Sequence, residues 1–181
     1  YELLVHGKER GPVSDMKFQD IFISYGDASV LNGRIFITGL PHLEETSFNC
    51  KFKQLSSSQT DLTTIKTYPF TSGETISVPE FLKNAKQIDF VGRFNGFYYD
   101  FVTYGKFTSA NGSVSTDLQL SQNENNDIYY DGKITTENFN LAQLTNKPKL
   151  FDKASIDIDI KGKGLDFKCI ELNVAGDASA F

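Results

Sequence analysis

The sequence predicts a mainly β fold that is antiparallel where the turns are short, with one or two short helices. Apolar and polar residues alternate in short runs along most of the chain, and Gly, Asn or Asp stands between one run and the next. This pattern is typical of strands with one wet face, unlike the continuous apolar runs of parallel sheets. The chain also contains 16 Phe and 8 Tyr, residue types that favour strands.

A closed β-sandwich is the default architecture for such alternation. Two features weaken this default. The runs near both ends of the sequence look like continuing sheet. Glycines also lie within or beside the strands, where they permit strong bending: Gly92, Gly105, Gly132, Gly162 and Gly164.

Composition and charge argue against several classes of function. With a net charge of -5, the chain has no electrostatic footprint for nucleic acid. No run approaches the ~20 apolar residues of a membrane-spanning helix, and the first residues lack the pattern of a signal peptide. We expect residues 1–181 to be a single fragment of a longer β-rich region, which a Ser/Thr-rich stretch and a short helix near residues 55–87 would subdivide.

The first runs predict half-exposed strands, and a short helix follows them. Each strand places its apolar residues on one face: Ile21, Ile23 and Tyr25; Ile35 and Ile37; Phe48, Cys50 and Phe52. After the Ser/Thr-rich stretch, a proline in a first turn and apolar residues at helical spacing predict one short helix: Pro79, Phe81, Leu82 and Ala85.

Strands resume densely in the second half of the chain. Asn95-Gly96 and Asn111-Gly112 are hairpin-turn candidates, because such residues take positive φ at low cost. A helical turn is predicted around Leu141 and Leu144, and a bulge between Cys169 and Ile170. The strand faces are Val114, Leu118 and Leu120 with Thr116 between them; Ile128, Tyr130 and Ile134 across Gly132; and Ala154, Ile156, Ile158 and Ile160.

Catalytic, cofactor and metal motifs are absent from the sequence. His6 and His42 are expected at the surface, and Asp157 and Asp159 on a solvated face. The run from Asn123 to Asp127 matches no calcium loop. The two cysteines, Cys50 and Cys169, form no disulfide framework, and whether they pair is open; Cys50 fits a small buried residue. Asn111-Gly112-Ser113 fits a glycosylation acceptor but also a hairpin turn. We therefore expect a non-enzymatic protein without a cofactor.

Several segments together resemble one family. GLPHLEETSF, then IDFVGRFNGFYYDFVTYGKFTSANGSVSTDLQL, then YYDGKITTENFNLAQL and IDIDIKGKGLD follow in an order and phrasing that resemble TamB proteins (translocation and assembly module) of Bacteroidota, within the AsmA-like group. The resemblance runs from about Phe18 to Phe167, and no single motif is diagnostic.

The resemblance implies an inner-membrane protein of a Gram-negative bacterium, with one anchor and a long periplasmic body. The resemblance also implies the architecture: in that family the body is an elongated, curled, antiparallel-rich sheet with an open apolar groove (a β-taco). The family is linked to phospholipid transport between the membranes and to outer-membrane protein translocation and assembly with an outer-membrane barrel partner. The family offers no catalytic residues. By the same resemblance, we expect residues 1–181 to lie between the anchor and the region thought to meet the barrel and to include neither.

The residues and the resemblance together give one functional hypothesis. Phospholipid acyl chains would lie against an apolar groove ~50 Å long if ten or so strands stack at about 4.8 Å. The alternative for the same residues is a closed core. A rival function is a closed-sandwich module that recognises glycan or protein through Phe97, Tyr98 and Tyr99, and a third is a structural spacer. The predicted groove residues are Ile35, Ile37, Phe48, Phe52, Val114, Leu118, Leu120, Ile128, Ile134, Ile156, Ile158 and Ile160.

Overall fold

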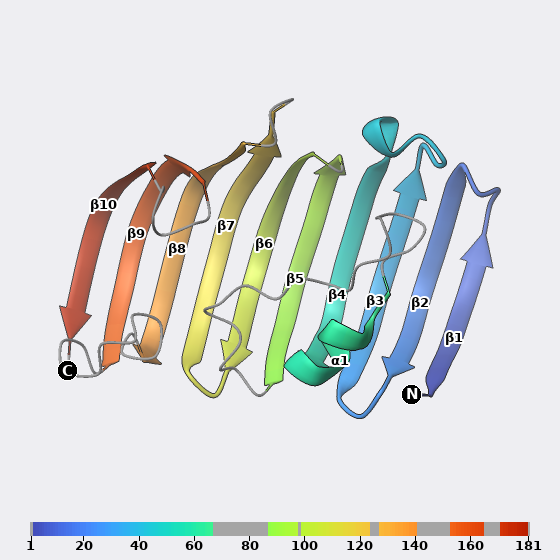
Figure 1. The fold of residues 1–181 in the computed structure, drawn as a ribbon, viewed down its shortest axis with the longest axis horizontal. Helices are drawn as coiled ribbons and strands as arrows, with labels where there is room; N and C mark the ends of the chain where they lie inside the picture. Colours follow the sequence, from blue (N-terminus) through green and yellow to red (C-terminus); the bar gives the residue numbers. More distant parts are fainter. Residues whose placement is uncertain are drawn as a thin grey trace.

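The computed structural model describes residues 2–66, 87–97, 99–123, 127–140, 153–164 and 171–180. In these residues ten strands form one antiparallel sheet in chain order, and the sheet is not closed (Figure 1). The predicted mainly β, open fold is therefore confirmed. The strands are β1 Leu3–Arg10, β2 Asp15–Tyr25, β3 Ser29–Thr38, β4 Ser47–Ser58, β5 Gln87–Phe97, β6 Asp100–Ser109, β7 Gly112–Gln122, β8 Ile128–Asn140, β9 Lys153–Lys163 and β10 Glu171–Ala180; the helices are η1 Leu43–Glu45 and α1 Gln59–Thr64.

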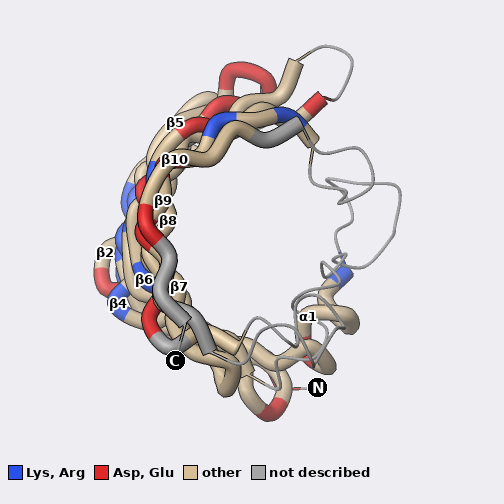
Figure 2. The backbone as a smooth tube through the Cα atoms, turned by 90° about the vertical axis from the view of Figure 1, so that its left-hand side faces the viewer, with Lys and Arg blue, Asp and Glu red and all other residues tan. Residues whose placement is uncertain are grey.

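The strands curve, so that the sheet seen along its stacking direction follows an arc (Figure 2). Directly paired residues of antiparallel strands point to the same side of a sheet. One row of pairs runs from Phe48 on β4 through Gly96 and Phe101 to Leu120 and Tyr130 on β8. We call the side that carries this row the inner face and the opposite side the outer face.

Burial distinguishes the two faces. The buried apolar residues belong to the inner face: Ile21, Cys50, Phe90, Tyr130 and Ile160. By contrast, Tyr104 on the outer face is 62% exposed. This difference is expected of a curled sheet, because side chains converge on its concave side.

Ion pairs between neighbouring strands occupy the outer face. Lys161 Nζ lies 2.6 Å from Asp131 Oδ2, and Lys133 Nζ lies 2.7 Å from Asp157 Oδ1. Hydrogen bonding to Asp157 raises the pKa of Lys133. Because these groups are exposed, such pairs contribute little to stability. Asp157 and Asp159 are exposed, which confirms the predicted solvated face.

Register shifts interrupt the pairing at several places and help the strands to bend. One lies between Phe52 and Leu55, where β4 has one more residue than its partner β5, and another between Thr136 and Phe139 on β8. An extra residue in one strand bends that strand and increases its local twist. After each shift the apolar residues return to the inner face, since Leu55 pairs with Phe90 and Phe139 with Ala154.

Glycines on β5 and β6 make room for an aromatic ring. Gly92 and Gly105 are direct partners, and a Cβ on Gly105 would lie 2.6 Å from Cε2 of Phe90. The Phe90 ring therefore lies against the glycine backbone and stacks on Phe107, with 4.4 Å between ring centroids. The sequence predicted that these glycines permit bending, and the structure gives them a role in packing Phe90.

Helix α1 was not predicted at its position. Ser58 caps it, because the Ser58 side chain accepts a hydrogen bond from the backbone N–H of Asp61 at 3.1 Å. The Asp61 carboxylate, 1% exposed, accepts hydrogen bonds from the Ala28 N–H at 2.9 Å and the Ser29 hydroxyl at 2.9 Å. This carboxylate fixes α1 to the turn between β2 and β3.

The electrostatics of Asp61 follow from the same contacts. Burial raises the pKa of Asp61, but the hydrogen bonds from Ala28, Ser29 and Asp27 outweigh it, so the pKa lies below its ordinary value. The carboxylate is therefore ionised at neutral pH, where it stabilises the turn.

One predicted turn is wrong and another is confirmed. Asn95-Gly96 lies inside β5, which ends at Phe97, and Gly96 pairs with Phe101 at φ +139°. The strand continues because glycine adopts this backbone conformation without ending the pairing. Asn111 does lie in the tight turn between β6 and β7, but this turn comprises Ala110 and Asn111, and Gly112 already pairs with Ser109 as the first residue of β7. The helix predicted around Pro79, the helical turn around Leu141 and Leu144, and the bulge at Cys169 and Ile170 fall outside the described residues.

We predict that Asp61→Asn lowers the free energy of unfolding by roughly 2 kcal/mol at pH 7, because charged hydrogen bonds to a buried carboxylate are lost. Urea unfolding measures this loss, with Asp117→Asn on the outer face as a control. Since the folded pKa is depressed, the difference is present above the ordinary pKa of 3.8 and disappears as the pH falls through the folded value. A difference that persists undiminished in strong acid would contradict this role.

We predict that Gly105→Ala destabilises the fold by about 1–3 kcal/mol. The added methyl would meet the Phe90 ring and the carbonyl oxygen of Val91, 2.5 Å away. Thermal unfolding followed by circular dichroism measures the effect, and Ser115→Ala on the outer face is the control. An unchanged melting temperature would show that Phe90 does not pack against this glycine.

Candidate functional site

The predicted groove residues all fall on the inner face. Ile37 pairs with Phe48 and Ile35 with Cys50, while Phe52 pairs with Gly33 and Gly92. The rows continue across the second half of the sheet through these pairs: Leu120 with Phe101 and Tyr130, Leu118 with Gly132, Val114 with Thr136, Ile128 with Gln122, Ile134 with Ile158, Ile160 with Gly132, and Ile156 with Thr136. The register therefore brings all these residues together on one surface.

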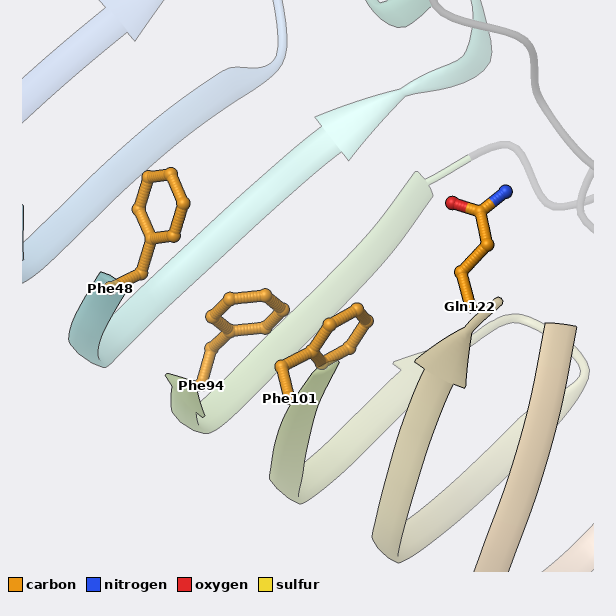
Figure 3. A pocket seen from close by; sticks show the side chains of 4 residues that line it. All are labelled: Phe48, Phe94, Phe101 and Gln122. Atoms are coloured by element: carbon orange, nitrogen blue, oxygen red, sulfur yellow. The ribbon is translucent and has the colours of Figure 1, made fainter. Parts of the chain in front are cut away.

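A pocket opens on the inner face over β4, β5, β6 and β7. Phe48, Phe94, Phe101 and Gln122 line it, and its volume is about 440 Å³. Figure 3 shows the three rings following one another across neighbouring strands, with Gln122 further along the sheet. The Phe94 and Phe101 ring centroids lie 4.2 Å apart, and those of Phe48 and Phe94 lie 6.3 Å apart in an edge-to-face arrangement.

Of the residues that line this pocket, the sequence predicted Phe48 as a groove residue but not Phe94, Phe101 or Gln122. Because a hairpin turn was predicted at Asn95-Gly96, the predicted strand ended before these residues, and the alternation through Phe94 and Gly96 was not recognised. Phe90, Gly92, Phe94 and Gly96 keep a period of two through β5, so allowing glycine as a strand residue reveals Phe94 as inward-facing.

A second aromatic cluster lies on the same three central strands. Phe52 and Phe90 meet edge to face at 6.1 Å between centroids, and Phe90 stacks on Phe107. Cys50 lies between the two clusters, since it is two residues from both Phe48 and Phe52 on β4. The inner face is therefore aromatic over its middle strands and mainly aliphatic over β7 and β9, while β8 adds the aromatic side chains of Tyr130 and Phe139.

The inner face carries no charge over most of its length. From β2 to β10, no inward position that the register assigns in the described strands holds Asp, Glu, Lys, Arg or His. The ion pairs of β6 to β9 lie on the outer face. From β2 to β10 the inner surface therefore suits apolar chains, because the described strands place no charged side chain there that could bind an ionic group.

Several hydroxyl groups of the described strands interrupt this apolar surface, and two of them are buried without a partner. Thr116 Oγ1 and the Tyr130 hydroxyl are buried and have no hydrogen-bond partner within the described part of the chain. The residues are 9% and 6% exposed, respectively. Leaving a buried hydroxyl without a partner costs about 1–3 kcal/mol. The alternating pattern predicted on which face of their strands Thr116 and Tyr130 lie. It did not predict that their hydroxyls have no hydrogen-bond partner.

Cys50 is a free cysteine, and it is buried like a small apolar residue. Burial raises the pKa of the Cys50 thiol to about 11. The thiolate is therefore scarce near neutral pH, and Cys50 is poorly suited to nucleophilic or redox chemistry. Cys169 falls outside the described residues.

The remaining polar candidates have structural explanations. His6 is exposed on β1, and His42 precedes η1 at the surface. Asp127 pairs with Lys163 at 2.9 Å and with the Asn123 side-chain amide at 3.0 Å, and these groups hold the pKa of Asp127 below its usual range. Among the described residues, no three His, Cys, Asp or Glu side chains gather closely enough to hold a metal ion.

The sequence also singled out the rings near residue 98 for recognition, Asn111 for glycosylation, and the question of membrane-spanning helices. Phe97 and Tyr99 flank the turn between β5 and β6 and are 51% and 40% exposed, while Tyr98 lies outside the described residues. Asn111, in the glycosylation pattern, is only 9% exposed. None of the helices within the described ranges has the length and apolar character needed to span a membrane.

Comparisons of the chain with protein-family models, with curated proteins and with solved structures find no match.

We predict that iodoacetamide modifies Cys50 at least tenfold more slowly in the native protein than in urea at pH 8, because the thiol is buried and its pKa is raised. Mass spectrometry of a Cys169→Ser variant isolates the Cys50 signal. Equal labelling in both states would contradict the packing described for the centre of the inner face.

Proposed function

We propose that the inner face of the curled sheet binds phospholipid acyl chains, and that the protein is a non-enzymatic component of envelope biogenesis. The observation that carries the proposal is a mainly apolar inner face, uncharged from β2 to β10 in the described strands, on a single sheet that is not closed. The proposal needs no catalytic group, because acyl chains bind through burial alone.

The energetics suit this role. An acyl chain gains about 0.8 kcal/mol for each methylene removed from water, so ~14 buried methylenes would offset roughly 11 kcal/mol of hydration. Aromatic rings such as those of Phe94 and Phe101 offer large apolar area without polar atoms. Because no directional contact is required, such a surface accepts chains of different length and unsaturation.

The wider setting of the proposal comes from the resemblance to TamB proteins. By that analogy the chain is part of a periplasmic body anchored in the inner membrane of a Gram-negative bacterium. Phospholipid would pass along the groove between the membranes, and the full-length protein would meet an outer-membrane barrel partner. A groove of this kind also suits outer-membrane protein translocation and assembly, since the edge strands β1 and β10 each have only one neighbour in the described sheet.

A second candidate function rests on the exposed rings of Phe97 and Tyr99 at the turn between β5 and β6. Rings at such a turn suit glycan or protein recognition. This candidate no longer includes a closed sandwich, because the described strands form one sheet. It makes no use of the apolar inner face.

We predict saturable binding of a fluorescently labelled phosphatidylcholine, weakened roughly tenfold by Leu118→Asn, because a leucine side chain contributes about 1.5–3 kcal/mol of burial. Leu118 lies on the inner face between Thr103 and Gly132. The control is Val102→Asn on the outer face of β6, where Val102 is 43% exposed, and this change should leave the affinity within about twofold of wild type.

Circular dichroism must show both variants folded. Equal weakening by the two substitutions would contradict binding on the inner face. Saturable glycan binding that is lost in Tyr99→Ala, without any lipid binding, would favour the second candidate.

A further inference from the structure

The hydroxyls of Thr116 and Tyr130 are the only buried side-chain polar atoms without a hydrogen-bond partner among the described residues. Both belong to the inner face. Thr116 pairs with Gly105 on β6 and Ile134 on β8, and Tyr130 pairs with Leu120 on β7 and Gly162 on β9. None of these direct neighbours has a polar side chain that could accept the hydroxyl proton.

The site favours an acceptor that is neutral. No inward position from β2 to β10 in the described strands carries a cationic side chain, so a buried carboxylate or phosphate would lack a countercharge. Burial raises the pKa of Tyr130, which keeps its hydroxyl protonated as a donor. An ester carbonyl is a neutral acceptor that occurs directly beside an acyl chain.

We propose that the hydroxyls of Tyr130 and Thr116 donate hydrogen bonds to ester carbonyls of a diacyl glycerolipid. This inference rests on the proposed function and deepens it, because it names the lipid class and the part of the lipid that the protein recognises. Leu120, the partner of Tyr130, is four positions after Thr116 on β7, or about 13 Å along the strand. The two hydroxyls therefore provide two separate positions for a carbonyl.

A carbonyl bound at Tyr130 would place the acyl chain so that it runs across the strands toward the aromatic pocket. Leu120 pairs with Tyr130 on one side and with Phe101 on the other, and Phe101 is a wall of the aromatic pocket. A carbonyl at Tyr130 is thus about 10 Å, two strand spacings, from the first ring. From there the chain can extend past Phe101 and Phe94 to Phe48.

The test compares two phosphatidylcholines with the same headgroup and saturated C16 chains, one with ester and one with ether linkages. The ether lipid lacks the carbonyl acceptors. We expect the wild-type chain to bind the diester about fivefold more tightly than the diether, as one neutral hydrogen bond would give. Tyr130→Phe should abolish most of this preference by weakening diester binding alone, and Thr116→Val should reduce it further in the double variant.

A matched control changes a tyrosine hydroxyl on the other face. Tyr104→Phe on the outer face of β6, where Tyr104 is 62% exposed, should leave the ester preference unchanged. Without lipid, Tyr130→Phe and Thr116→Val should melt at or above the wild-type temperature, because each removes an unpartnered polar atom. The increase in melting temperature caused by the diester lipid should shrink in the same variants.

The outcomes separate this inference from the proposed function. Equal affinities for diester and diether in the wild type would overturn carbonyl recognition while leaving acyl-chain binding intact. Equal weakening of both lipids by Tyr130→Phe would also overturn it, since the tyrosine would then act through packing. Absence of binding to either lipid would overturn the proposed function, and the inference with it.

Discussion

The register of the antiparallel sheet is the constraint on which the rest of the structure depends. Each strand pairs with the next in the chain, so the side on which one strand places its apolar residues is transmitted to its neighbour. A slip of one residue would turn every inward side chain outward. Ion pairs such as Lys161–Asp131 mark the outer face, and ring contacts such as Phe94–Phe101 mark the inner one. The separation of charge from apolar surface is therefore a direct result of pairing.

Curvature follows from how glycines and register shifts are placed within this pairing. Gly92 and Gly105 let the Phe90 ring approach the backbone, and the shift between Phe52 and Leu55 bends β4 beside it. At the turn between β2 and β3, Asp61 fixes α1 to the sheet. These features shape an apolar surface without closing it, which is the property that acyl-chain binding needs.

The sequence was most informative where alternation is unbroken. Ile156, Ile158 and Ile160 could be assigned to one face because the period of two is unambiguous there. Phe94 was missed because glycine was treated as a turn signal, although Gly96 at φ +139° continues the strand. Helix α1 was missed in a Ser/Thr-rich stretch, yet Ser58 with Asp61 three residues later has the spacing of a capping box. Whether strands close into a sandwich depends on long-range packing, which alternation does not encode.

The unpartnered hydroxyls of Thr116 and Tyr130 also depend on which residues the register brings beside them, and no local pattern contains that information. The measurement that tests the account most directly is native mass spectrometry of the purified chain, followed by solvent extraction and lipid identification against a mock purification. The account predicts phospholipid retained at a defined ratio to protein. A compact, lipid-free protein that also excludes added phospholipid would contradict it.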